Sequence, residues 1–103
     1  VIPQIDVPME NDYTKEEMKM VNETNKIMHS SFAISATCVR VPVFRSHSEA
    51  ITVTFDDSVD VDIDKIKLAL HEFENVEVTD DLENGKYPMP TISTDTDITF
   101  VGR

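Results

Sequence analysis

The chain has 103 residues, 40% of them hydrophobic, with 20 acidic residues against 9 basic ones and a net charge of -11. This hydrophobic share predicts a packed domain rather than a disordered chain. The charge argues against nucleic acid and anionic membrane as partners. A single cysteine, Cys38, excludes a secreted disulfide framework, so we expect a reducing, cytoplasmic compartment. No stretch has the pattern of a membrane span or a signal peptide.

The two ends of the chain look cut from a longer protein. The sequence begins at Val1 in apolar residues and stops at Arg103, just after an expected strand. Ordinary N-terminal processing is the alternative. We expect residues 1–103 to form a single, partial domain, because a chain this short is only marginally stable without a partner.

A helix is predicted from about Thr14 to Met28. Thr14 and Glu17 have the spacing of a capping box, in which each side chain bonds the backbone of the other residue. An apolar stripe follows at helical steps, formed by Met18, Met20, Val21 and Ile27.

Two strands are predicted next. The pattern from Phe32 to Phe44 is β-rich, and Glu49 to Phe55 alternates between apolar residues and threonine. The short connection at residues 44–48 is consistent with a hairpin. Pro42 donates no ladder hydrogen bond, which favours an irregular or edge position for that strand end.

The rest of the chain predicts one helix and two short strands. Asp62 is the expected N-cap of a helix with an apolar stripe; strands are expected at Val76–Val78 and Ile98–Val101, and a loop with a turn at Asn84-Gly85 lies between them. The predicted fold class is α+β, a mainly antiparallel sheet with helices on one face. The stripe contains Ile63, Ile66, Leu70 and Phe73.

The densest chemical signal is Arg40, Arg45 and His47 around a strand end. Arginine binds carboxylates bidentately and histidine exchanges protons near neutral pH, so the group suits a small anionic substrate. Surface ion pairs and a solvated turn histidine are the alternative. Because seven extended residues span about 23 Å, Arg40 and His47 share a substrate only if the chain folds back between Val43 and Ser48.

Several segments together resemble a known family in order along the whole chain. They are Pro3–Asp6, Tyr13–Lys19, Asn22–Ile27, Ala36–Val43, His47–Glu49, Tyr87–Pro90 and Phe100–Arg103. Each is weak alone, but together they closely resemble the aspartate-semialdehyde dehydrogenase family. Departures include Met18, where the family often has tryptophan, and Ser46, where it often has glycine.

The resemblance implies a fold, an activity and partners. The fold is part of a glyceraldehyde-phosphate-dehydrogenase-like C-terminal domain. The activity is NADPH-dependent reduction of aspartyl phosphate to aspartate semialdehyde, with release of phosphate, for lysine, threonine and methionine synthesis. The implied assembly is a homodimer formed through this domain.

The resemblance also implies roles for four residues. His47 is similar to the family's acid/base histidine and Arg40 to the arginine that holds the substrate α-carboxylate. Glu16 is similar to the glutamate that binds the substrate amino group, and Lys19 to the lysine of the phosphate subsite. Without the resemblance, Glu16 and Lys19 are better explained as a surface ion pair three residues apart on a helix.

The chain alone is predicted to be inactive. The family's chemistry needs a cysteine nucleophile and a glycine-rich dinucleotide site. Gly85 and Gly102 are the only glycines, so NADP is expected in the full-length enzyme and not on this fragment. Cys38, in a β-rich apolar run, is expected to be a small packed residue. No metal is expected, because the three histidines, His29, His47 and His71, lack ligand spacing.

Two other functions remain open. One is a free-standing, non-catalytic acidic interaction or dimerisation module of the same fold. The other is the sister reductase that acts on an acetylated glutamyl phosphate. The combination of Tyr13–Lys19 with Arg40–His47 argues against the sister reductase.

Overall fold

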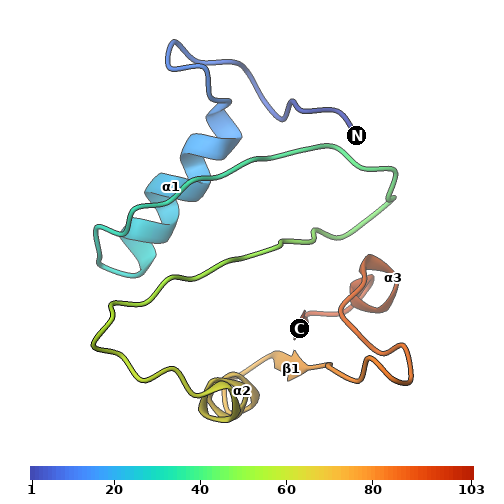
Figure 1. Ribbon diagram of the computed structural model, residues 1–103. Helices are drawn as coiled ribbons and strands as arrows, with labels where there is room; N and C mark the ends of the chain where they lie inside the picture. Colours follow the sequence, from blue (N-terminus) through green and yellow to red (C-terminus); the bar gives the residue numbers. More distant parts are fainter. The chain divides into compact units, whose positions relative to one another are not determined.

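A computed structural model describes all residues, 1–103, and divides the chain into two compact units, Val1–Pro42 and Val43–Arg103. The elements in chain order are α1 (Lys15–Ile27), α2 (Ile63–His71), β1 (Val76–Val78), α3 (Pro90–Ser93) and β2 (Thr99–Val101) (Figure 1). These elements agree with an α+β class. A single domain over residues 1–103 stays a prediction.

Helix α1 begins with the predicted capping box. The Thr14 hydroxyl accepts the Glu17 N–H at 3.3 Å, and the Glu17 carboxylate accepts the Thr14 N–H at 2.8 Å. Two N–H groups that a helix start leaves without partners are thereby satisfied. Thr14 is the one buried residue of the chain, at 7% exposure. The helix ends at Ile27, with Met28 as its C-cap, as the sequence predicts.

An extended segment runs back along α1 toward its start (Figure 1). The Asn25 side-chain amide donates to the Phe32 carbonyl at 3.1 Å near the end of the helix. Near its start, the Cys38 N–H donates to the Glu17 carboxylate at 3.0 Å. The segment and the helix are therefore antiparallel, and side chains of α1 hold both ends of the segment.

Helix α2 starts at Asp62, which is the predicted N-cap. The Asp62 carboxylate accepts the N–H groups of Asp64 and Lys65 at 3.0 and 3.2 Å. The helix packs against β1. Ile66 and Leu70 of the predicted stripe are half-buried, whereas Ile63 and Phe73 are exposed. The apolar face of α2 is thus only partly covered.

The two predicted C-terminal strands are confirmed, but their pairing differs from the expectation. β1 and β2 form a parallel pair in which Val76 lies beside Thr99 and Val78 beside Val101. A parallel pair needs a long crossover, and residues 79–98 supply one. The mainly antiparallel sheet is therefore not confirmed.

The crossover holds more structure than the expected loop. The predicted Asn84-Gly85 turn forms, with Gly85 at φ 66°. A short helix, α3, then starts at Pro90, because proline is well suited to the first position of a helix. Gly102 follows β2, and a side chain there would collide with the carbonyl oxygen of Thr79.

The predicted hairpin, formed by strands at Phe32–Phe44 and Glu49–Phe55, does not form. No strand occurs from Phe32 to Val61, and the one bridge in this range joins Arg40 to Ile2. The division between the two units falls between Pro42 and Val43, inside the first expected strand. An extended segment becomes a strand only when a neighbour accepts and donates its backbone hydrogen bonds.

The chain lacks a buried apolar core. No hydrophobic residue is buried, and the accessible surface is 9117 Å². A compact monomer of 11.7 kDa would expose roughly 5,900 Å². Large hydrophobic residues are exposed, including Val41, Val43, Phe44, Ile51 and Val53. None of the helices has the length and apolarity needed to cross a bilayer.

We predict that Thr14→Ala destabilises α1 by about 1 kcal/mol, because the alanine side chain cannot accept the Glu17 N–H. Far-ultraviolet circular dichroism of the 103-residue chain should show lower helicity. Thr14→Ser keeps the hydroxyl and serves as the matched control. Equal helicity for the alanine and serine variants would contradict a capping role.

Candidate functional site

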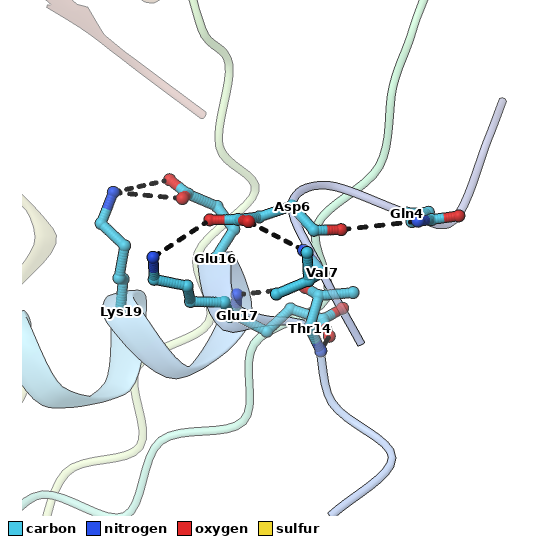
Figure 2. Close-up of polar contacts among 8 residues, drawn as sticks. Gln4, Asp6, Val7, Thr14, Glu16, Glu17 and Lys19 are labelled. Atoms are coloured by element: carbon cyan, nitrogen blue, oxygen red, sulfur yellow. Dashed lines mark hydrogen bonds and ion pairs between the residues drawn. The ribbon is translucent and has the colours of Figure 1, made fainter. Parts of the chain in front are cut away.

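Glu16 and Lys19 form an ion pair on the first turns of α1. The Lys19 ammonium lies 3.1 Å from Glu16 Oε2 and 3.4 Å from Oε1 (Figure 2). The hydrogen bond and the charge of Glu16 raise the pKa of Lys19. Their side chains are 30% and 45% exposed, respectively, so a solute can reach both charges.

The segment before α1 adds a second ion pair beside the first (Figure 2). The Lys15 ammonium lies 3.9 Å from Asp6 Oδ2, and Asp6 Oδ1 accepts the N–H of Val7 at 2.8 Å. The backbone carbonyl of Asp6 accepts the Gln4 amide at 3.5 Å. Lys15 and Lys19 offset the charges of Asp6 and Glu16, but Glu17 on the same turn leaves the start of the helix with an excess of negative charge.

Glu17 connects the start of α1 to the extended segment. One carboxylate oxygen accepts the Thr14 N–H, and the other accepts the Cys38 N–H. These two backbone bonds, that of Thr14 first, lower the pKa of Glu17. Its place in the capping box is visible in the sequence. Its bond to Cys38 is not, because no local pattern links residues so far apart in the chain.

Arg40 lies two residues beyond Cys38. Its backbone forms a bridge with Ile2, with Arg40 N–H to Ile2 carbonyl at 2.8 Å and the reverse bond at 3.0 Å. The Arg40 side chain is exposed. Three of the four predicted site residues, Glu16, Lys19 and Arg40, therefore belong to one unit, Val1–Pro42.

His47 belongs to the other unit and is exposed. The chain bends just before it, because Ser46 has φ 73°, a conformation that favours glycine. The Ser46 hydroxyl lies 3.4 Å from the Pro90 carbonyl oxygen and 3.3 Å from the Thr94 hydroxyl. These contacts fix the bend to α3. A pocket shared by Arg40 and His47 stays a prediction.

Arg45 differs from Arg40 because its side chain forms an ion pair on the surface. Its guanidinium lies 3.5 Å from the Asp95 carboxylate, and both side chains are largely exposed. Arg45 thus has a surface partner just before His47. Surface ion pairs are the alternative explanation for both arginines, and Arg45 forms such a pair.

Neither glycine of the chain belongs to a dinucleotide-binding loop. Gly85 lies in the turn between Asp81 and Lys86, and Gly102 packs against Thr79. A dinucleotide fingerprint needs several glycines between a strand and a helix. The two glycines therefore do not form such a fingerprint. No three histidine, cysteine, aspartate or glutamate side chains form a metal-ligand group.

Comparison with known proteins gives one consistent answer. The family "Semialdehyde dehydrogenase, dimerisation domain" matches residues 1–103. The chain is 60% identical over 103 residues to the aspartate-semialdehyde dehydrogenase of Campylobacter jejuni, covering 100% of this chain and 29% of that protein. It is 48% identical over 102 residues to that of Helicobacter pylori (strain J99), covering 99% of this chain and 29% of that protein.

A solved structure agrees with these relatives. The crystal structure of aspartate semialdehyde dehydrogenase II from Vibrio cholerae matches with a TM-score of 0.77 and 32% identity, over 99% of this chain and 30% of that chain. The chain spans less than a third of the length of the relatives it matches.

We predict that acid releases the contact between Glu17 and Cys38. Because the Glu17 pKa is lowered from 4.5, its contribution to stability is fully present above that value and is lost as the pH falls through the folded-state pKa. The Cys38 amide resonance should titrate with that lowered pKa. Glu17→Gln should abolish this titration, and its persistence in the variant would assign it to another group.

Proposed function

Because the chain belongs to the semialdehyde dehydrogenase family by its dimerisation domain, we propose that it supplies the substrate-binding and acid–base residues of an aspartate-semialdehyde dehydrogenase. The proposed reaction is the NADPH-dependent reductive dephosphorylation of aspartyl phosphate to aspartate semialdehyde, a step toward lysine, threonine and methionine. The observation that carries the proposal is the end-to-end match, at 60% identity, to a protein of that name.

In this proposal Glu16 and Lys19 bind the two charged groups of the substrate. The substrate ammonium pairs with Glu16, and the phosphate pairs with Lys19. Glu16 then exchanges the Lys19 ammonium, 3.1 Å away, for the substrate ammonium. Lys19 exchanges the Glu16 carboxylate for the substrate phosphate. Exposed ion pairs contribute little to stability, so opening this one costs little when substrate binds.

Arg40 holds the α-carboxylate of the substrate. A guanidinium offers two parallel N–H donors that match a carboxylate. Arg40 suits this role because its backbone is fixed by two hydrogen bonds to Ile2 while its side chain is exposed. A fixed backbone with an exposed side chain orients the guanidinium without blocking it.

His47 transfers the proton. An imidazole nitrogen accepts the proton of an attacking thiol and later returns it to the departing group, since histidine changes protonation state near neutral pH. The bend at Ser46, bonded to Pro90 and Thr94, supports this role because it gives His47 a defined backbone.

The residues of this chain do not complete the reaction. Cys38 is half-buried, and its N–H is bonded to Glu17, which suits a packed structural residue. The nucleophilic thiol and the nucleotide site are proposed to come from the remainder of the enzyme. NADP, when bound there, supplies or accepts the hydride.

The proposed assembly is a homodimer through this domain. The family description names dimerisation. The chain also exposes roughly 3,000 Å² more than a compact monomer of its mass. Two such chains together expose an excess of about 6,000 Å², which is more than the total of about 2,000–5,000 Å² that an obligate interface buries on both partners. Some of it is proposed to pack against the remainder of the enzyme.

A non-catalytic dimerisation module is the second candidate. The observation that favours it is the Glu16–Lys19 pair, which needs no ligand to explain it. The two candidates differ in whether this chain supports turnover when it replaces the matching segment of a related enzyme. The module predicts none.

We predict that a chimera, in which this chain replaces the matching 29% of the Campylobacter jejuni protein, catalyses phosphate-dependent oxidation of aspartate semialdehyde. The 103-residue chain alone should show no turnover, because it lacks the nucleotide site. Reduction of NADP is followed at 340 nm, a wavelength at which only the reduced cofactor absorbs. Activity of the chain alone would contradict the proposal, and an inactive but folded chimera would favour the module.

We predict that His47→Asn in the chimera lowers kcat by about 10²–10⁴-fold, because general acid–base catalysis is worth that much. The KM for aspartate semialdehyde should change little. His71→Asn is the matched control, since His71 is an exposed histidine on α2 in the same unit. Equal kcat values for the two variants would remove His47 from the proton transfer.

A further inference from the structure

We propose that Glu17 is a positioning residue for the substrate site, whose carboxylate holds Arg40 in place relative to Glu16 and Lys19. This inference rests on the proposed function, because it concerns the alignment of those three residues. Glu17 itself does not touch the substrate in this proposal.

The two carboxylate oxygens of Glu17 accept hydrogen bonds from different parts of the first unit. Oε2 accepts the Thr14 N–H at 2.8 Å, inside the helix cap. Oε1 accepts the Cys38 N–H at 3.0 Å, outside the helix. A helix cap alone needs only the first of these bonds. The second is a tertiary contact between α1 and the segment that carries Arg40.

Both hydrogen bonds of the Glu17 carboxylate lie a short distance along the chain from the residues proposed to bind substrate. Cys38 and Arg40 are two residues apart in extended backbone, so they are about 7 Å apart and face the same side. Glu16 directly precedes Glu17, and Lys19 follows two residues later. The Glu17 carboxylate is therefore a side-chain link, close in sequence to all three residues proposed to bind the substrate, between α1 and the segment of Arg40.

The two hydrogen bonds require a carboxylate at position 17. Both groups that Glu17 meets are N–H donors, so the position requires two acceptor oxygens and no donor. Glutamine has one oxygen and would place an NH2 group against one of the two donors. Aspartate keeps the charge but is one methylene shorter, so it cannot reach Thr14 and Cys38 together.

Backbone bonds provide a second connection. Arg40 pairs with Ile2, and the Lys15 N–H donates to the Val7 carbonyl at 2.9 Å, so residues 2–7 join the Arg40 segment to the start of α1. These bonds survive substitution of Glu17. We therefore expect a Glu17 variant to keep the elements and lose their fine alignment.

The experiment compares Glu17→Gln, Glu17→Asp and Glu10→Gln in the chimera. Glu10 is exposed and lies in the turn before α1. Its substitution by glutamine removes the same charge at a position that has no role in the proposal. We expect both Glu17 variants to raise the KM for aspartate semialdehyde by about tenfold or more, the effect of one lost charged hydrogen bond. The kcat should fall much less, and Glu10→Gln should change neither constant.

A double-mutant cycle with Arg40→Ala separates positioning from general destabilisation. If Glu17 acts through Arg40, Glu17→Gln adds almost nothing to the KM of Arg40→Ala. Multiplicative effects on KM, or a Glu17→Gln KM equal to that of the parent, would overturn the inference. Thermal midpoints of all variants show whether a KM change accompanies a loss of fold.

Failure of the proposed function gives a different result. Arg40→Ala would then leave the KM for aspartate semialdehyde unchanged, and the positioning inference would fall with it. An Arg40→Ala variant with raised KM, beside a Glu17→Gln variant with parental KM, would reject the positioning role alone.

Discussion

The local structure of the first unit depends on the reciprocal hydrogen bonds between Thr14 and Glu17. They start α1 at a defined residue, and Glu17 then reaches the Cys38 N–H as well. A helix start leaves several N–H groups without partners, so a carboxylate there has a strong local reason to be fixed. The chain uses the same group for a long-range contact, which makes helix initiation and segment alignment depend on one side chain.

Burial is the main constraint on the rest of the molecule. With no hydrophobic residue buried, caps, backbone bridges and ion pairs carry more of the local order than they do in a domain with its own core. The Lys67–Asp80 ion pair, which joins α2 to the residues after β1, and the Asp62 cap of α2 are examples in the second unit. Such contacts set local geometry well but offset little of the entropy cost of folding. The apolar residues between 41 and 61 stay uncovered within this chain.

The proposed chemistry is divided between the two units. The unit Val1–Pro42 carries the three charged residues proposed to bind substrate, and the unit Val43–Arg103 carries the proposed proton-transfer residue. In the proposal, substrate binding and proton transfer thus depend on different local supports, Glu17 for Arg40 and Ser46 for His47. Although the chain as a whole is strongly negative, Lys19 and Arg40 place two positive side chains in the first unit for the anionic groups of the proposed substrate.

Local elements were determined by the sequence itself. The Thr14 capping box, the Asp62 N-cap, the turn at Gly85 and the strands Val76–Val78 and Thr99–Val101 each follow from residues close together in the chain. The sequence also carried the family resemblance, since the motifs recur in order along the chain. Short-range hydrogen bonding and side-chain periodicity are enough for such predictions.

Only the tertiary structure decided which segments meet. The parallel pairing of β1 with β2, the bridge between Ile2 and Arg40 and the bond from Glu17 to Cys38 all join residues that are distant in sequence. Alternation shows that a segment suits a strand, but it does not name the neighbour, because every extended backbone offers the same donors and acceptors. The partners are selected by packing and chain connectivity, which exist only once the chain has folded.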